Sequence, residues 1–194
     1  MNAPLSRTWS SDVLRQPARG QALYRSTKTY DHNEGLSCCF RQWRAQSHCN
    51  LLHGYALAFR FVFATDTLDD KNWCMDFGGL KEVRAWLHEM FDHTVLIAAD
   101  DPHKPEFERM AGLGLMDLRE LPAVGCEAVA QHVFDHVGRM IGADTKGRVW
   151  VESVEVLEHS GNSAIYQKEF HDNGPAHRAI VARHARPVSR PLTS

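Results

Sequence analysis

Residues 49–64, CNLLHGYALAFRFVFA, are the stretch of sequence that decides the fold. From residue 55 to residue 64, large apolar side chains alternate with small or polar ones. This period of two is typical of a strand with one buried face. The polar cluster at residues 65–72 then turns the chain, so the strand is expected to belong to an antiparallel hairpin.

The start of this strand carries a candidate reactive centre. Cys49 lies four residues before His53, and a thiol near an imidazole can lose its proton and act as a base or a nucleophile. An inert buried cysteine is the alternative interpretation. His53 and Tyr55 are two residues apart on a strand, so both point to the same face and can act on one ligand.

The remaining segments between the ends of the chain alternate between strand and helix patterns. Expected elements are a strand at residues 36–42, a helix from 80 to 91, a helix from 127 to 141 and a last strand at 149–158. Residues 95–123 are irregular, and a loop with a short helix and a short strand is expected there. The order strand, strand, helix, helix, strand predicts an α+β fold, an antiparallel sheet with two helices packed on one face.

Length and composition indicate one globular domain. With 194 residues, of which 43% are hydrophobic, the chain can bury a single core, and we expect a domain at 26–170 between tails at 1–25 and 171–194. The net charge of -2 argues against nucleic-acid binding. No apolar run or leader-like N-terminus suggests a membrane segment, so a cytoplasmic protein with free thiols is expected.

Three further acidic or imidazole positions could serve a ligand. Asp92-His93 directly follows the first predicted helix, where a carboxylate can set the tautomer of the neighbouring ring; a surface pair is the alternative. Glu158 shares a face with apolar strand residues, and its carboxylate could hold the amidine-like edge of a pterin or a guanine by two parallel hydrogen bonds. Glu127 opens the second helix, where capping is the default role.

These motifs occur in the order found in a known family. Residues 30–166 resemble the 6-pyruvoyltetrahydropterin synthase and 6-carboxytetrahydropterin synthase family, which has the tunnelling fold, or T-fold. The resemblance rests on Cys49-x-x-x-His53-Gly54, Met75-Asp76-Phe77-x-x-Leu80-Lys81, Phe91-Asp92-His93, Glu127, and Glu158 on the last strand with Tyr166 beyond it. Five signals in this order are more specific than any one of them.

The resemblance implies a lyase that acts on dihydroneopterin triphosphate or a related pterin. It assigns Cys49 as the catalytic thiol, Asp92 and His93 as an acid/base relay, and Glu158 as the anchor of the pterin ring, with Glu127 and Tyr55 also facing the substrate. It also implies zinc held by three histidines, which polarises the substrate side chain. Rings of subunits with sites at their borders are typical of the family, so a homo-oligomer is expected.

The zinc ligands are where this chain departs from the family. Phe40 stands where the first histidine belongs and Tyr55 where the third belongs, so His53 alone remains, and a catalytic zinc needs three protein ligands. Cys38, Cys39, His48 and Cys49 are chemically capable substitutes. Cys38 and Cys39 point to opposite faces of a strand, so at most one of them could join such a site.

Three functions remain open from the sequence. The first is an enzyme of pterin or deazapurine (queuosine) precursor metabolism, in which donors such as Tyr55 take over polarisation of the substrate. The second is a zinc-free, non-catalytic T-fold protein that binds a pterin or a purine. The third is a structural oligomer, which the retained Cys49 and Asp92-His93 do not favour, since packing does not require those residue types.

Overall fold

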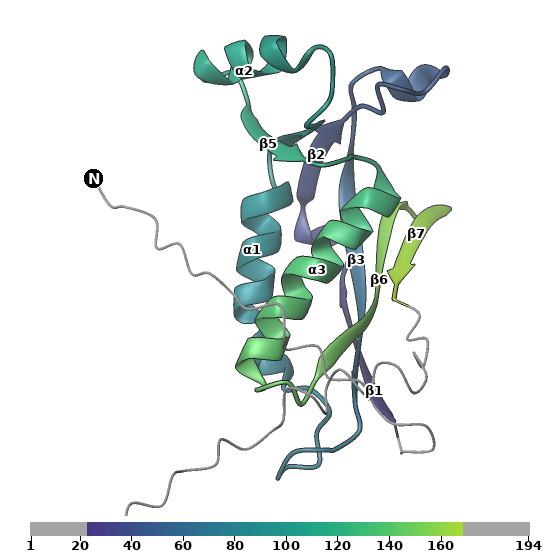
Figure 1. Cartoon of the computed structure of the whole chain (residues 1–194), viewed down its shortest axis with the longest axis vertical. Coiled ribbons are helices and arrows are strands. Elements are labelled where there is room, and N and C mark those ends of the chain that lie inside the picture. The colour runs from purple at the N-terminus through teal and green to yellow at the C-terminus, as the bar shows by residue number, and fades with distance from the viewer. Residues whose placement is uncertain (1–22, 169–194) are drawn as a thin grey trace, which may run out of the picture.

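The computed structural model describes residues 23–168 and has an α+β architecture in which one seven-stranded sheet carries two long helices on one face (Figure 1). The expected fold class is therefore confirmed. The segments predicted as tails lie outside the described residues, except for residues 23–25. Two of these three residues already belong to the first strand.

The described residues form ten main elements. The strands are β1 Tyr24–Tyr30, β2 Leu36–Phe40, β3 His53–Thr65, β4 Thr94–Ala98, β5 Asp117–Leu121, β6 Trp150–His159 and β7 Asn162–Gln167. The α-helices are α1 Lys81–Phe91, α2 Lys104–Gly112 and α3 Cys126–Asp144. Single turns of 3-10 helix occur at η1 His32–Glu34, η2 His48–Asn50 and η3 Phe77–Leu80.

The long strand β3 organises the sheet, as its alternating pattern predicted. Phe59, Phe61 and Phe63 are each 0% exposed, and they alternate with residues of the opposite face. The first half of β3 pairs with β2 and the second half with β1, while β6 pairs along its other side. The sheet order is β5-β4-β2-β3-β6-β7, so β3 is bonded on both sides over most of its length.

The prediction of an antiparallel sheet with five elements in the order strand, strand, helix, helix, strand was wrong in detail. The sheet is mixed, because β4 runs parallel to β2 and β5 runs parallel to β4. The expected first strand is the second, and the strand expected to be last is followed by β7. The region at 95–123 was expected to hold a short helix and a short strand; the short helix is confirmed as α2, but two five-residue strands, β4 and β5, flank it.

Strands β1, β4, β5 and β7 lack a local sequence pattern that would identify them. β1 and β7, YRSTKTY and NSAIYQ, are polar and largely exposed, and the strands that they pair with supply their hydrogen bonds. β4 and β5 are too short for a period of two to be recognised. These four segments are strands because of their neighbours in the sheet and not because of a local pattern.

Helices α1 and α3 lie beside each other on one face of the sheet, while α2 stands at the end of the molecule next to β5 (Figure 1). Trp86 of α1 stacks on the imidazole of His136 of α3, with ring centroids 3.9 Å apart and planes inclined by 6°. Burial lowers the pKa of His136 to about 4, and the nearby Arg139 guanidinium adds to this shift. Within residues 23–168, no helix has the length and apolar character needed to span a bilayer.

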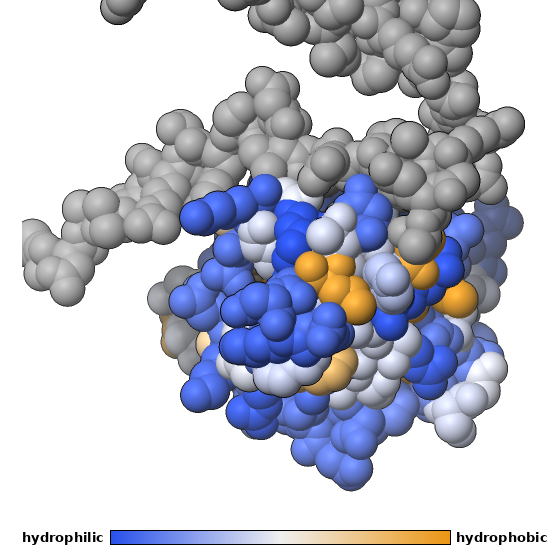
Figure 2. Space-filling view, turned by 90° about the horizontal axis from the view of Figure 1, so that it is seen from below, coloured by the Kyte–Doolittle hydropathy of each residue, from blue (hydrophilic) through white to orange (hydrophobic). Residues whose placement is uncertain are grey.

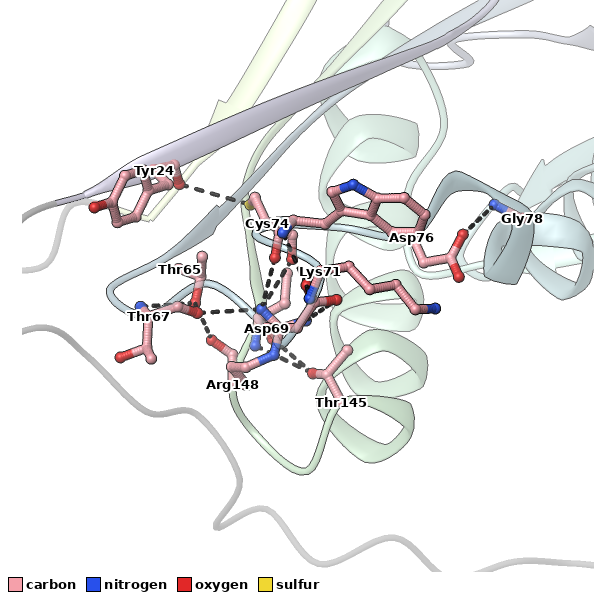
Figure 3. A network of polar contacts seen from close by, with 12 residues as sticks. Tyr24, Thr65, Thr67, Asp69, Lys71, Cys74, Asp76, Gly78, Thr145 and Arg148 are labelled. Carbon is pink, nitrogen blue, oxygen red and sulfur yellow. Dashed lines mark hydrogen bonds and ion pairs between the residues drawn. The ribbon is translucent and has the colours of Figure 1, made fainter.

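The end of the molecule where β3 leaves the sheet is tied together by one side chain. Arg148 Nη1 donates to the carbonyls of Thr67, Trp73 and Cys74 at 3.1 to 3.3 Å (Figure 3). We call the loop at residues 66–74, together with Arg148, the clamp end. Figure 2 views the molecule from this end, where a few apolar side chains lie among mainly hydrophilic ones. Trp73 is 46% exposed there.

Candidate functional site

The opposite end of β3 holds a group of aromatic rings from three segments. His53 and Phe40 are partners across β3 and β2, and Tyr55 is opposite Cys38 on the same pair of strands. The ring centroid of Phe40 lies 5.1 Å from that of His53 and 6.2 Å from that of Tyr55. His159, at the end of β6, brings its ring centroid to 6.3 Å from that of Tyr55. Phe40, His53, Tyr55 and His159 are called the aromatic group below.

Polar groups from β6 and α3 lie next to Tyr55. Burial raises the pKa of the Tyr55 hydroxyl, and the Glu158 carboxylate and the thiols of Cys49 and Cys126 add to the shift. Burial likewise raises the pKa of Cys126 to about 12, again with a contribution from Glu158. Segments distant in the sequence therefore meet here, and we call Cys49, Tyr55, Cys126, Glu158 and the aromatic group the site end.

The hydrogen bonds of the two histidines define their neutral tautomers. A carbonyl oxygen only accepts, so His53 Nδ1 donates to Leu51 O at 2.7 Å and leaves Nε2 as an acceptor. The backbone N–H of Gly161 donates to His159 Nδ1 at 3.1 Å, so the hydrogen of that ring is on Nε2. The two free ring nitrogens therefore have opposite roles, with His53 accepting and His159 donating.

Cys49 is held by the loop between β2 and β3. It lies in η2, where the Ser47 hydroxyl caps the turn, and its carbonyl accepts a hydrogen bond from the backbone N–H of Gln42 at 2.9 Å. The Gln42 side chain packs against Gly125, at the start of α3, so closely that a Cβ on Gly125 would lie 2.3 Å from Nε2. Gln42 thus connects the Cys49 loop to the helix that carries Cys126.

The Asp92-His93 pair belongs to a different hydrogen-bond network. His93 Nδ1 is 2.6 Å from Asp92 Oδ1, and these bonds with His93 and, at 3.4 Å, with His88 lower the pKa of the Asp92 carboxyl. Glu34 accepts from Arg84 at 2.8 Å and lies 3.4 Å from His88, which extends the network. The hydrogen bonds of both Asp92 and His93 side chains within residues 23–168 go to this network and not to Cys49. The His93 side chain is 90% exposed.

The structure thus brings together some of the expected site residues and not others. His53, Tyr55, Glu158 and Cys49 converge, and Glu127 lies in the first turn of α3 beside Cys126. Val154 and Val156 are 0% exposed, as their spacing predicted, while Glu158 lies at an irregularity of β6 between Leu157 and His159, with its carboxylate next to Cys126 of α3. Asp92 and His93 follow α1 as expected, and their side chains bond to each other and to His88.

The donor atoms at the site end do not fit a zinc ion. The side chains at the two positions where histidines would be needed are a hydrocarbon ring, Phe40, and a neutral phenol, Tyr55. Cys38 is 1% exposed and burial raises its pKa to about 12, which disfavours the thiolate that binds metal. Cys39 pairs with Gly54 on the opposite face. The described part of the chain contains no group of three His, Cys, Asp or Glu side chains that could hold a metal.

Three site residues were missed by sequence reasoning. Cys126 and His159 are immediate neighbours of Glu127 and Glu158, which were singled out, but nothing in the local pattern distinguishes them. Gln42 carries no chemical signal of its own. Their importance depends on contacts between β2, α3 and β6 that the sequence does not display.

The mixed sheet with helices on one face, and a cluster of thiol, imidazole, phenol and carboxylate at one end, define an α+β protein with the T-fold. A family model described as 6-pyruvoyl tetrahydropterin synthase matches residues 29–169. This match covers most of the chain, which therefore belongs to the 6-pyruvoyl tetrahydropterin synthase family.

Curated relatives point in the same direction. The chain is 28% identical over 155 residues to a 6-carboxy-5,6,7,8-tetrahydropterin synthase of Aquifex aeolicus, a match that covers 77% of this chain and 92% of that protein. A protein of the same name from Rickettsia felis is 27% identical over 94 residues, covering 47% of this chain and 67% of that protein. These identities are modest, so they support the family and leave the reaction to be tested.

Solved structures support the fold. An uncharacterized protein from Wolinella succinogenes superimposes with a TM-score of 0.65 at 21% identity, covering 76% of this chain and 99% of that one. The 6-pyruvoyl tetrahydropterin synthase of Plasmodium falciparum gives a TM-score of 0.55 at 15% identity, with 76% and 99% covered.

Proposed function

We propose that the chain binds a pterin at the site end and is a lyase that acts on dihydroneopterin triphosphate or a related pterin. The observation that carries this proposal is the convergence of Glu158, Tyr55 and Cys49 from β6, β3 and η2. A carboxylate, a neutral phenol and a thiol within reach of one ligand are the groups needed to hold a heterocycle and move a proton on its side chain.

Glu158 would anchor the heterocycle. Its carboxylate accepts two parallel charge-assisted hydrogen bonds from an amidine-like edge, such as the 2-amino group and N3 of a pterin. In the described residues its side chain has no ion-pair partner, and its near neighbour is the protonated Cys126 thiol. Glu127, in the first turn of α3, lies close enough to Cys126 to face the same ligand.

Cys49 would carry the proton transfer on the side chain of the pterin, and the Asp92-His93 pair would act as the second acid/base group. Within one chain His93 points to solvent, so its contribution requires a neighbouring copy that presents it to the Cys49 side of the site. A homo-oligomer with the site at a subunit border meets this requirement, and it also covers polar groups of the open sheet face.

Two variants and one control test the proposal. Purified protein is incubated with dihydroneopterin triphosphate and with dihydroneopterin, and products are separated by chromatography. We expect turnover by the wild type and by Cys39→Ser, whose thiol lies on the opposite face of β2, and a loss of at least about a hundredfold for Cys49→Ala. Equal turnover by the wild type and Cys49→Ala would contradict the catalytic role.

A zinc-free protein that binds a pterin or a purine without converting it is the second candidate. The replacement of metal donors by Phe40 and Tyr55 favours it. It predicts calorimetric binding that weakens in Glu158→Gln together with unchanged ligand recovered after incubation. Glu155→Gln is the matched control, because Glu155 lies on β6 like Glu158 but pairs with Arg60 of β3.

A further inference from the structure

One residue of the site end has no part in the proposed function so far. His159 ends β6, one position after Glu158, and its ring faces Tyr55 at a centroid distance of 6.3 Å with planes inclined by 49°. We propose that Tyr55 and His159 bind the oxygen-bearing side chain of the ligand through two hydrogen bonds, in the place where the family resemblance expects a metal. This inference rests on the proposed pterin site.

The aromatic group can bind the oxygen atoms of a ligand only through the hydrogen-bonding atoms of its rings. Phe40 is 1% exposed and offers only carbon atoms, and the centroids of His53 and Tyr55 lie 5.6 Å apart in an edge-to-face arrangement. Rings packed in this way support one another and fix the direction of the Tyr55 side chain. A rigid phenol is a preorganised hydrogen-bond donor, which a flexible side chain is not.

Tyr55 has a hydroxyl that is available to a ligand. No other group of residues 23–168 hydrogen-bonds to it. Burial and the nearby Glu158 carboxylate raise the pKa of the hydroxyl, so the phenol is neutral. A neutral phenol both donates and accepts one hydrogen bond. The hydroxyl can therefore donate to a carbonyl or hydroxyl oxygen of the ligand.

His159 supplies the second donor. Because the backbone N–H of Gly161 occupies Nδ1, the neutral ring presents Nε2–H. The turn at Gly161 fixes the ring, and a Cβ at that glycine would lie 3.3 Å from both Cε1 and Nδ1 of the imidazole. Across the aromatic group, His53 presents Nε2 as an acceptor, so a hydroxyl of the ligand could donate there while its oxygen accepts from Tyr55 and His159.

The chemical class that fits is a pterin with a hydroxylated or carbonyl-bearing substituent on the ring, whose heterocycle is held by Glu158. A bare pterin would use Glu158 alone. The distinction between the two ligands isolates the contribution of Tyr55 and His159 from that of the anchor.

The test compares neopterin, which carries a trihydroxypropyl side chain, with unsubstituted pterin by titration calorimetry on full-length protein dialysed against a chelator. We expect neopterin to bind more tightly to the wild type, and Tyr55→Phe and His159→Ala each to weaken neopterin about three- to tenfold while leaving pterin unchanged. Tyr24→Phe, at the clamp end, and the exposed His103→Ala are matched controls that should behave as wild type. Melting curves verify that each variant is folded.

The outcomes separate this inference from the proposed function. Glu158→Gln should weaken both ligands; if it does so while Tyr55→Phe and His159→Ala change neither, the inference on the side chain fails and the pterin site stands. If neither ligand binds the wild type, or Glu158→Gln has no effect, both fail. A preference for neopterin that disappears on chelation and returns with one equivalent of zinc would also overturn the inference, because a metal would then hold the side chain.

Discussion

The clamp end and the site end lie at opposite ends of β3 and use their polar groups differently. At the clamp end, Arg148 donates to three carbonyls, and Asp69 Oδ1 accepts from the backbone N–H groups of Lys71 and Trp73 at 2.9 and 2.8 Å. At the site end, the Glu158 carboxylate accepts from the weak thiol donor of Cys126, and the Tyr55 hydroxyl has no hydrogen-bond partner among the described residues. Polar groups satisfied internally stabilise a fold, whereas those left free can serve a ligand.

The polar groups at one end of β3 therefore stabilise the fold, whereas those at the other end are available to bind a ligand. At one end of the strand, the Arg148 guanidinium donates hydrogen bonds to the carbonyl groups of the loop at residues 66–74 and holds that loop in place. The other end keeps its hydroxyl, thiol and carboxylate exposed enough for a small molecule, and it fixes them by packing aromatic rings. The following changes test that separation.

The largest effect is expected at the clamp end. Arg148→Ala removes bonds to Thr67, Trp73 and Cys74 and leaves a 75% covered position without its cation, so we expect a loss of about 2 to 4 kcal/mol in the free energy of unfolding. Denaturant titration measures it. Arg109→Ala is the control, because among residues 23–168 its exposed side chain pairs with Glu106 alone. A loss below about 0.5 kcal/mol for Arg148→Ala would show that the loop is held in another way.

The next largest loss of stability is expected where the site end contacts α3. Gly125 has φ 106 and ψ 161, a region that favours glycine, and an added Cβ would meet Gln42 Nε2 at 2.3 Å. Gly125→Ala should therefore lower the free energy of unfolding by about 2 to 3 kcal/mol. It should also weaken neopterin binding, since Gln42 contacts the Cys49 loop. Repeating Gly125→Ala in a Gln42→Ala background keeps the backbone strain and removes the collision, so an equal loss in the two backgrounds would refute a role for Gln42.

A smaller, pH-dependent effect is expected between the two helices. The folded state holds the pKa of His136 at about 4, below its ordinary 6.5, so from pH 6.5 down to 4 the unfolded chain binds the additional proton and stability falls as the pH falls. About 1 to 2 kcal/mol should be lost across this window, less than the full shift implies because the ring keeps access to solvent.

The His136→Phe variant keeps a ring to stack on Trp86 and removes the proton. Comparing its unfolding free energy with that of the wild type at pH 7 and at pH 4.5 isolates the contribution of this group. The exposed His103→Phe serves as control. A wild-type pH dependence that persists unchanged in His136→Phe would assign it to other groups, such as His132, whose pKa is lowered for the same reason.

The smallest effect on stability is expected at the site end. Tyr55→Phe and Glu158→Gln remove groups without strong internal partners, so each should change the free energy of unfolding by less than about 0.5 kcal/mol. The same denaturant titration applies. A loss above about 1.5 kcal/mol for either variant would mean that the site end, like the clamp end, uses its polar groups for the fold.

Much of the fold follows from local patterns in the sequence. The alternation around Phe59, Phe61 and Phe63 identifies β3, and the helical spacing of Val83, Leu87 and Phe91 identifies α1, because each pattern matches the geometry of one buried face. The polar β1 and β7 and the short β4 and β5 have no such pattern. Their state is decided by pairing with neighbouring strands: β1, β4 and β5 with strands more than 15 residues away, and β7 with the adjacent β6.

The candidate site divides in the same way. Cys49, His53 and Glu158 were identifiable because their residue types and order match a family pattern, and Tyr55 because it replaces a histidine of that pattern. His159, Cys126 and Gln42 were not, because their relevance depends on ring contacts, burial and close packing between separate elements.

The sequence by itself determined the α+β class, the long central strand, the two main helices and the loss of two histidines from the expected zinc set, since all of these depend on residue type and spacing. Only the tertiary structure decided the parallel pairing of β4 and β5, the hydrogen bond of His93 to Asp92, and the approach of His159 to Tyr55. The physical reason is that these features depend on the three-dimensional positions of groups, which residue type and spacing along the sequence do not fix.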